Sequence, residues 1–392
     1  MPKNGETWII EMQIAGGLYT EICVVPSWHE EFGSGGRAAA AVSKLSPGSV
    51  LHTYAKCDKQ AGIDRLKALG IEIRRSPCQN GVVFAYFHPL STPHIEPTPA
   101  KIFQNDPIHL EGKAVLRFGF LDGDAIVKAE RAVYDPQTSK SPAPFYRNGS
   151  TAKELALIVN AAEAISIAPK LNALEACREI VSTHFANVVV LKRGPFGAVV
   201  FEDNGSERSI PAYRSDSVFK IGTGDVFSAI FAYYWAEEQR PPAEAADLAS
   251  QYVSLYVATR SLPEQNFGDV KLVSVGQTNA LPLRLEGKVD TIGRRYTLEE
   301  ACFRLRELGA EVVCPLIDGP RSFDEDWGSL LVLSDQPEEP AIQRCIKAVS
   351  DGRVVTLLLE ISDQHSMLKL LDEGVNVTSD FATALYQACW ST

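Results

Sequence analysis

Along the first two-thirds of the chain, short runs of apolar residues alternate with segments in which apolar residues recur every three or four positions. The first pattern is typical of strands buried on both faces, and the second of amphipathic helices. The predicted strands are 8–16, 49–57, 82–88, 113–120, 188–194 and 198–203. The predicted helices are 36–45, 61–70, 124–132, 154–167, 174–184, 222–238 and 243–261. This alternation predicts a mostly parallel sheet between two layers of helices, a three-layer αβα fold.

A second alternating series follows a stretch at 262–269 that we interpret as a linker. Its predicted strands are 270–276, 310–316, 329–334 and 354–361, and its predicted helices are 298–309, 340–352 and 366–374. We therefore expect a first domain over 1–265 and a smaller, flavodoxin-like α/β domain over 270–392. The proline-rich residues 89–107 are predicted to form a loop inside the first domain.

Composition narrows the classes of function. The chain has 392 residues, with 38 basic and 49 acidic side chains and a formal net charge of −11, which argues against nucleic-acid binding through a basic face. The longest apolar run, 227–236, has ten residues and is too short to span a membrane. Glu6 and Glu11 lie where a signal peptide needs a cationic start, and the eight cysteines form no CxxC pair. We expect a cytoplasmic protein that acts on a small molecule.

The sharpest chemical signal is the segment KIGTGDVF at 220–227, where a loop leads into an apolar helix. Gly222 and Gly224 carry no Cβ, so the backbone can turn tightly and approach a ligand closely. The amides of 222–225 would then lie at the positive end of a helix, which favours anions and phosphate above all. Asp225 could accept a proton from a substrate hydroxyl there. Alternatively, it could be an ordinary helix cap.

Other motifs lie upstream of this segment. Asn160 and Glu163 are three positions apart on the predicted helix 154–167, and an amide oxygen with a carboxylate suits a hydrated Mg²⁺. A predicted strand–turn–strand at 188–201 contains Gly194 and Gly197. Near the start of the chain, Gly35 and Gly36 open an alanine-rich helix.

In this order, over about residues 8–262, these motifs resemble the PfkB (ribokinase-like) family of sugar and nucleoside kinases. The GAGD signature of the family stands here as 222–225, its NxxE motif as 160–163, its early GG turn as 35–36, and its V-x-D-P strand end as 133–136. The resemblance implies a ribokinase-like fold and an ATP- and Mg²⁺-dependent transfer of phosphate to a hydroxyl of a sugar, nucleoside or related small molecule.

The resemblance also implies roles for individual residues. Asp225 would be the base, the amides of Gly222, Thr223 and Gly224 would form the anion hole, and Asn160 and Glu163 would hold Mg²⁺ through waters. The implied nucleotide-binding residues are Lys192, Gly194, Gly197 and Lys220. The implied substrate-binding residues are Glu21, Gly35 and Gly36. Kinases of this family often form homodimers through a lid, so a homodimer is one expectation.

The chain departs from the family pattern at several positions. Phe219 and Lys220 replace the usual D-T before the glycine turn, and the usual threonine before Gly194 is replaced around Lys192. Ala40 stands near the place of a substrate-binding asparagine, and alanine cannot hydrogen-bond a sugar hydroxyl. We therefore expect an acceptor other than a plain ribose bound in the usual way. The lid is expected to be reduced to about 82–95.

The order of predicted elements over residues 293–318 weakly resembles that of nucleoside 2-deoxyribosyltransferase-like or TIR-like domains. The GTxxE-like sequence that contains the catalytic glutamate of those enzymes is not found. Asp318, the acidic run 324–326 and Glu360 could bind a polar ligand or simply be solvated. Two alternatives to a kinase therefore remain. One is a kinase-like sensor of a nucleotide or sugar that regulates the C-terminal domain. The other is N-glycosidic cleavage of a nucleoside by that domain.

Overall fold

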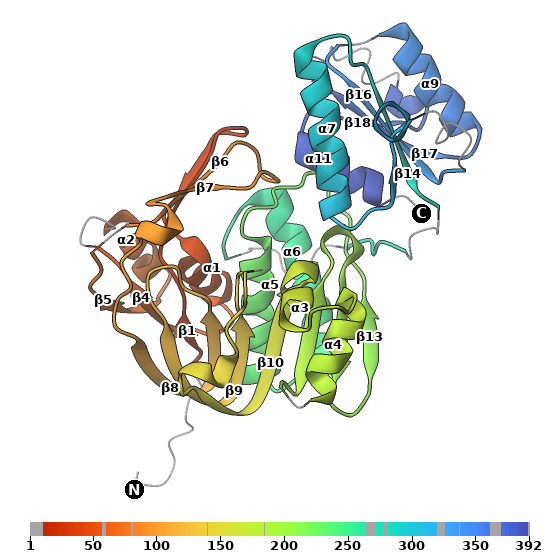
Figure 1. Ribbon diagram of the computed structural model, residues 1–392. Coiled ribbons are helices and arrows are strands. Elements are labelled where there is room, and N and C mark those ends of the chain that lie inside the picture. The colour runs from red at the N-terminus through yellow and green to blue at the C-terminus, as the bar shows by residue number, and fades with distance from the viewer. Residues whose placement is uncertain are drawn as a thin grey trace, which may run out of the picture. The chain divides into compact units, whose positions relative to one another are not determined.

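The computed structural model describes residues 11–56, 60–79, 81–138, 140–183, 185–263, 271–276, 281–319, 326–336, 338–360 and 370–390. The chain forms two compact units (Figure 1). The first unit comprises Met1–Lys192, Ala198–Ile210 and Ile221–Lys271. The second comprises Arg193–Gly197, Pro211–Lys220 and Leu272–Thr392. The predicted linker at 262–269 lies mostly outside the described residues.

A nine-stranded sheet forms the centre of the first unit, in the order β13-β12-β11-β10-β9-β8-β1-β4-β5. Its strands are β1 (Gln13–Ala15), β4 (Val50–Tyr54), β5 (Glu72–Ser76), β8 (Ile108–Phe118), β9 (Ala125–Asp135), β10 (Thr151–Asn160), β11 (Val188–Lys192), β12 (Ala198–Glu202) and β13 (Glu207–Ile210). All neighbours from β5 to β11 pair in parallel, whereas β12 pairs antiparallel with both β11 and β13. The predicted, mostly parallel sheet is therefore confirmed.

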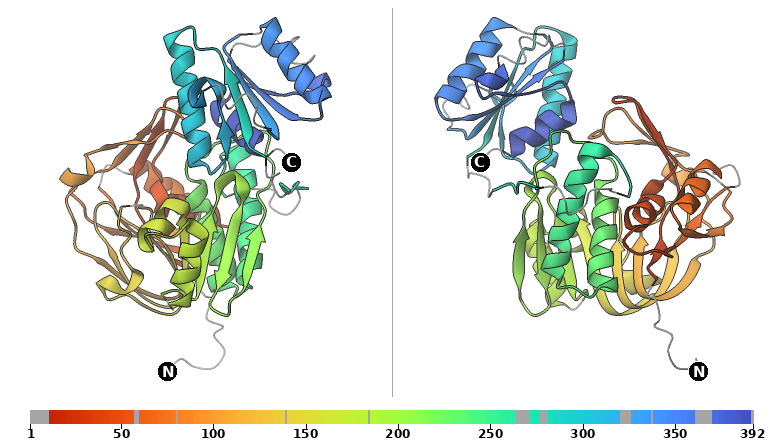
Figure 2. Two further views of the ribbon diagram at one scale, coloured as in Figure 1. Left: turned by 45° about the vertical axis from the view of Figure 1, so that its right-hand side comes forward. Right: turned by 180° about the vertical axis from the view of Figure 1, so that it is seen from behind.

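Helices cover both faces of this sheet (Figures 1 and 2). One face carries α1 (Gly33–Val42), α2 (Gln60–Ala68), α5 (Thr223–Ala232) and α6 (Pro242–Thr259), with a π-helical turn at Tyr233–Glu237 after α5. The other carries α3 (Ala161–Ile167) and α4 (Ala173–Ser182), which pack on a core that includes Leu157, Val159 and Ile180. The αβα architecture follows because the central strands are apolar on both faces and need cover on both.

Two predicted helices are wrong. Residues 124–132 belong to β9, where buried Ala125 and Val127 alternate with the less buried Ile126 and Lys128. Residues 154–160 belong to β10, whose stretch 155–159 is buried at every position. Periodicity alone cannot separate a short, wholly buried strand from a buried helix, so the pattern at 155–159 was ambiguous. The helix in this region is limited to α3.

A separate four-stranded sheet with the order β3-β2-β6-β7 also belongs to the first unit. It consists of β2 (Thr20–Cys23), β3 (Trp28–Glu30), β6 (Val83–Tyr86) and β7 (His94–Glu96). The segment 82–95, predicted to be the whole lid, supplies only β6 and most of β7. The other two strands come from the chain just before α1. The predicted loop 89–107 contains β7 and a 3-10 turn at Pro99–Lys101.

The second unit contains a five-stranded parallel sheet with the order β15-β14-β16-β17-β18. Its strands are β14 (Leu283–Gly287), β15 (Val312–Val313), β16 (Ser329–Ser334), β17 (Val354–Leu359) and β18 (Asn376–Thr378), and its helices are α7 (Ile292–Glu307), α8 (Pro315–Asp318), α9 (Glu339–Ser350) and α11 (Phe381–Cys389). Numbered along the chain, the strands lie in the order 2-1-3-4-5, the flavodoxin-like arrangement. The predicted fold class of this domain is confirmed.

Other predictions for this region differ from the structure or lie outside it. Of the predicted strand 270–276, the described residues 271–276 form only an isolated bridge, between Ser274 and Tyr213. The predicted helix 366–374 lies partly outside the described residues.

Two short segments from within the predicted first domain pack in the second unit. The indole N–H of Trp390 donates to the carbonyl oxygen of Pro195 at 3.1 Å, and the backbone N–H of Val218 donates to Oγ1 of Thr383 at 2.9 Å. The guanidinium of Arg214 donates to the carbonyl oxygen of Trp390 at 3.0 Å. The second unit is therefore assembled from three separate parts of the chain.

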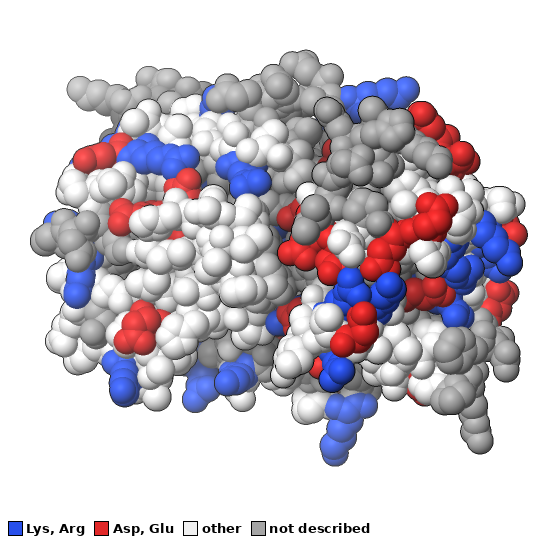
Figure 3. Space-filling view, turned by 90° about the horizontal axis from the view of Figure 1, so that it is seen from above, with Lys and Arg blue, Asp and Glu red and all other residues white. Residues whose placement is uncertain are grey.

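Charged side chains are intermixed on the surface. In the face shown in Figure 3, lysines and arginines lie next to aspartates and glutamates. The second unit shows the same arrangement in its ion pairs, such as Arg294 with Asp335 and Arg344 with Glu286. Within the described part of the chain, no helix is both long enough and apolar enough to cross a membrane.

Candidate active site

The glycine motif forms the beginning of α5, as predicted. Gly222 precedes the helix with a φ of +80°, in the left-handed region that favours glycine, and α5 begins at Thr223. A Cβ on Gly222 would lie 2.1 Å from Nε of Arg37, so no residue with a side chain fits at this position unless Arg37 moves. Asp225 lies in the first turn of the helix and is 9% exposed. The amides of this turn and the Asp225 carboxylate therefore share one helix N-terminus.

Arg37, which was not predicted as a site residue, makes an ion pair with Asp225. Its Nη1 donates to Oδ2 of Asp225 at 2.7 Å, and its Nη2 donates to Oε2 of Glu21 at 2.5 Å. Glu21, on β2, also accepts a hydrogen bond from the backbone N–H of Gly33 at 3.1 Å. Arg37 is only 1% exposed. The one signal in the sequence was a lone arginine in an alanine-rich helix, since a buried charge needs a partner.

The second carboxylate oxygen of Asp225 is also held. Nε2 of Gln137, a residue with a φ of 53°, donates to Oδ1 at 2.6 Å. Burial raises the pKa of Asp225 to about 6; the charge of Arg37 opposes this, whereas those of Glu21 and Asp135 add to it. A carboxylate with a pKa near neutrality is suited to general-base catalysis.

Lys192 places a second, partly buried cation in the first unit. It ends β11, and its Nζ lies 2.7 Å from Oδ2 of Asp135, which also accepts from the hydroxyl of Ser228 at 2.7 Å. Burial disfavours the charged form of Lys192, but Asp135 and Glu163 outweigh burial and raise its pKa. A Cβ on Gly224 would lie 3.4 Å from this Nζ. The ammonium group therefore lies beside the predicted anion hole.

Asn160 and Glu163 form a capping box rather than one face of a long helix. Asn160 is the last residue of β10 and the N-cap of α3. Its Oδ1 accepts from the backbone N–H of Glu163 at 2.9 Å, and Oε2 of Glu163 accepts from the backbone N–H of Asn160 at 2.9 Å. The predicted shared helical face is wrong because the helix starts only after Asn160.

The donor set nevertheless fits a hydrated Mg²⁺. Glu163 is 3% exposed, and burial together with the charge of Asp135 raises its pKa to about 7, while Lys192 opposes this. Near the site the carboxyl groups are Glu21, Asp135, Glu163 and Asp225, and the cations are Arg37 and Lys192. A divalent cation would offset this excess of negative charge. Among the described residues, no three His, Cys, Asp or Glu side chains form a group that could hold a metal ion by themselves.

The two glycines of the early GG turn allow α1 to pack closely. A Cβ on Gly35 would lie 2.5 Å from the carbonyl oxygen of Gly16, and one on Gly36 would lie 2.9 Å from Cδ1 of Leu18. This packing brings Arg37, the next residue, to the start of α5. The Trp28 ring of β3 lies 5.8 Å from the Arg37 guanidinium.

The predicted nucleotide-binding residues are divided between the units. Gly194 and Gly197 have positive φ angles of 55° and 75°, and they form the predicted tight turn between β11 and β12. Both residues and Lys220 belong to the second unit, whereas Lys192 belongs to the first. The structure therefore brings Lys192, Asp225, Glu21, the 222–224 turn and the 160–163 motif together in one unit.

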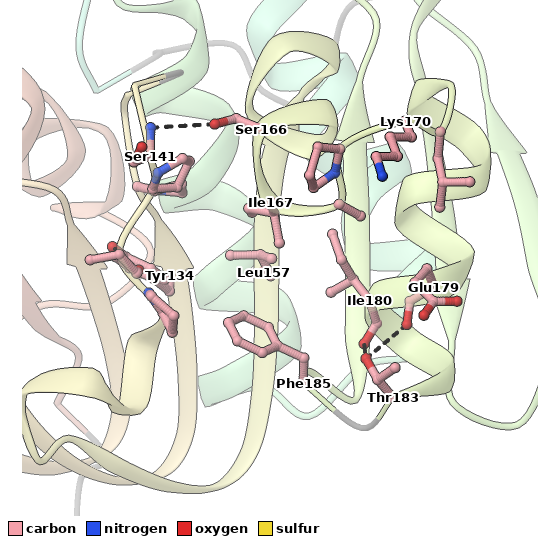
Figure 4. A pocket seen from close by; sticks show the side chains of 17 residues that line it. Tyr134, Ser141, Leu157, Ser166, Ile167, Lys170, Glu179, Ile180, Thr183 and Phe185 are labelled. Atoms are coloured by element: carbon pink, nitrogen blue, oxygen red, sulfur yellow. Dashed lines mark hydrogen bonds between the residues drawn. The ribbon is translucent and has the colours of Figure 1, made fainter.

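A cavity of about 750 Å³ lies in the first unit, and none of the predicted site residues lines it. Figure 4 shows Leu157 of β10, Ile167 of α3 and Phe185 gathered in its middle. Pro136 lines this cavity and lies in the chain between Asp135 and Gln137, which both contact site residues.

Part of the chain is similar to a known family of kinases. Residues 131–264 match the model of the pfkB family carbohydrate kinases, which confirms the resemblance over that range. No curated protein matches the chain. The first unit has a ribokinase-like α/β fold, as predicted. The predicted resemblance of the C-terminal domain to deoxyribosyltransferase-like domains is not confirmed.

Several solved kinases are similar in structure. Ribokinase from Thermotoga maritima shares 14% identity at a TM-score of 0.46, covering 65% of this chain and 95% of that chain. Fructokinase from Vibrio cholerae O395, bound to fructose, ADP and calcium ion, shares 13% identity at 0.47, covering 65% and 95%. A pyrophosphate-dependent kinase in the ribokinase family, complexed with a pyrophosphate analog and myo-inositol, shares 16% identity at 0.46, covering 63% and 94%.

Proposed function

We propose that this protein is a phosphotransferase that moves a phosphoryl group from ATP to a hydroxyl of a sugar, nucleoside or related small molecule, with Mg²⁺. The observation that carries the proposal is the Asp225 carboxylate at the N-terminus of α5, directly after the Gly222–Gly224 turn. This arrangement lies within the segment that matches the pfkB family. A base next to a helix N-terminus is the arrangement that phosphoryl transfer to a hydroxyl needs.

The proposed chemistry divides among three groups of residues. Asp225 accepts the proton of the acceptor hydroxyl, and the hydroxyl oxygen bonds to the γ-phosphorus as the bond from that phosphorus to ADP breaks. The amides at 222–224 and the ammonium group of Lys192 stabilise the negative charge of the phosphoryl oxygens. Asn160 and Glu163 would hold Mg²⁺ through waters, and the bound ion would supply positive charge to offset the negative charge of the donor phosphates.

A second candidate, a kinase-like sensor, is favoured by one observation. Both oxygens of Asp225 accept hydrogen bonds from the protein itself, from Arg37 and from Gln137. A base held in this way could belong to a site that binds a ligand without turning it over. Each carboxylate oxygen has a second lone pair, however, so these hydrogen bonds leave Asp225 able to accept a proton.

The experiment is a Mg²⁺-dependent assay of ATP consumption with a panel of sugars and nucleosides. We expect at least one acceptor to be phosphorylated, and Asp225→Asn to lower turnover by about 10²–10⁴-fold, as the loss of a general base does. Asp64→Asn, on α2, is the matched control because its carboxylate lies on the exposed side of the helix and contacts Gln60. Nucleotide binding without turnover of any acceptor would favour the sensor.

A further inference from the structure

The proposed reaction gives no role to Arg37, a fully buried charged residue that pairs with Asp225. It lies on α1, where its neighbours Ala38–Val42 are all fully buried. Burying a guanidinium costs several kcal/mol unless it is paired and hydrogen-bonded. Two buried carboxylates, Glu21 and Asp225, pair with it here. An arginine in such a place needs an explanation beyond helix packing.

The turn before α5 is shaped around this side chain. Gly222 has no Cβ, and any Cβ there would overlap Nε, Cδ and Cζ of Arg37 at 2.1–2.4 Å. Tyr256 of α6 also interacts with the guanidinium, and its hydroxyl donates to the carbonyl oxygen of Ile221 at 2.9 Å. The guanidinium is therefore enclosed by the same turn that supplies the proposed anion hole.

We propose that Arg37 is the positioning residue of the phosphotransfer site, and that its guanidinium keeps the Asp225 carboxylate ionised and fixed in orientation for proton transfer from the acceptor. This inference rests on the proposed function. It also assigns Glu21 a different task from the predicted one: Glu21 is the counter-ion of Arg37 rather than a direct ligand of the acceptor.

The charged groups around Asp225 support this role. Its charged and titratable neighbours are Arg37 on α1, Glu21 on β2, Tyr86 on β6, Asp135 on β9, Lys192 on β11 and Tyr256 on α6. Burial raises the pKa of Asp225, Arg37 is the largest opposing influence, and Glu21 and Asp135 raise the pKa further. Arg37 is therefore the main influence that favours the ionised form of Asp225, which is the form that can accept a proton.

The pairing with two carboxylates suits the proton transfer itself. When Asp225 takes the proton of the acceptor hydroxyl, its carboxylate becomes neutral and its ion pair with Arg37 weakens. Arg37 still has Glu21, whose Oε2 lies 2.5 Å from Nη2, so the buried cation is never left without an anion. A single-partner arginine would be unpaired at that moment, at a cost in the barrier.

The test is the pH profile of kcat and kcat/KM for Arg37→Met, Arg37→Lys and Glu21→Gln, measured with an acceptor found in the panel. In the wild type we expect an acidic limb near pH 6, since the base must be ionised. Arg37→Met should move the limb up by about two pH units, which lowers the ionised fraction of Asp225, and so kcat at pH 7, by about tenfold, with little change in the acceptor KM. Arg37→Lys should leave the acidic limb near pH 6, because the positive charge remains. It should lower kcat, because a lysine ammonium cannot reproduce the contact of the guanidinium with both Glu21 and Asp225.

Glu21→Gln should move the limb in the opposite direction, to lower pH, because it removes an anion that raises the pKa of Asp225. It also keeps the inference testable if Arg37→Met does not fold. The inference would be overturned if the acidic limb stays at the same pH in the variants, or if Arg37→Met turns over faster than the wild type. In either case the proposed kinase activity would still stand. A wild-type protein with no turnover would overturn the proposed function, and the inference with it.

Discussion

At the scale of single residues, Gly222 is required for two separate reasons. Its φ of +80° is unfavourable for residues with a side chain, and its missing Cβ leaves the space that Arg37 occupies. The first reason can be predicted from the motif, since a glycine turn before a helix needs this backbone freedom. The second cannot, because Arg37 lies far away in the sequence.

Gly222→Ala should therefore destabilise the first unit by about 2–4 kcal/mol, from backbone strain together with overpacking against Arg37. Chemical denaturation measures this loss. Gly224→Ala is the matched control, because a Cβ there would make only a 3.4 Å contact with the ammonium group of Lys192. Equal stability of the two variants would contradict the fit of Gly222 around Arg37.

At the scale of elements, the motif that caps α3 is also the proposed Mg²⁺ site. The capping box of Asn160 and Glu163 satisfies backbone groups that would otherwise have no partner at the helix start. The same two side chains are the proposed Mg²⁺ ligands. The sequence contained the NxxE pattern, but the preceding apolar run was ambiguous, so the strand and the cap were missed.

The two roles can be separated by substitution. Glu163→Gln should keep the cap, because glutamine serves equally at this position of the box, but should raise the Mg²⁺ concentration needed for half-maximal turnover by about tenfold. Asn160→Ala should cost about 1 kcal/mol of stability through loss of the cap and should also weaken the Mg²⁺ dependence. Mg²⁺ titration of turnover and chemical denaturation are the measurements. An unchanged Mg²⁺ requirement in Glu163→Gln would show that the motif only caps the helix.

At the scale of the whole molecule, the second unit is not a simple C-terminal addition. It includes Arg193–Gly197 and Pro211–Lys220, which contact α11 and the residue after it through Pro195, Val218 and Arg214. The proposed nucleotide-side turn is thus part of the same compact unit as the C-terminal domain. A division of the chain near residue 265 would cut through that unit.

Thr383→Val should destabilise the second unit by about 1–3 kcal/mol, because the buried N–H of Val218 loses its hydrogen-bond acceptor. Trp390→Phe should have a similar effect, since the carbonyl oxygen of Pro195 loses the indole donor. Thermal denaturation should show both losses. Thr297→Val on the exposed face of α7 is the control and should change stability by less than about 0.5 kcal/mol. A Thr383→Val protein as stable as this control would contradict the importance of the contact.

The sequence by itself determined the features that depend on neighbouring residues: the apolar runs of the sheet, the glycine turn before α5 and the order of the two α/β series. These are local because backbone freedom and burial patterns are properties of a few consecutive positions. Only the tertiary structure decided which charges meet. Arg37 and Asp225 are 188 positions apart, and Gln137 and Asp225 are 88 apart, and no periodicity encodes such pairs. Nor could a linear pattern place 193–197 and 211–220 in the second unit, because packing across the fold, rather than sequence neighbourhood, selects their partners.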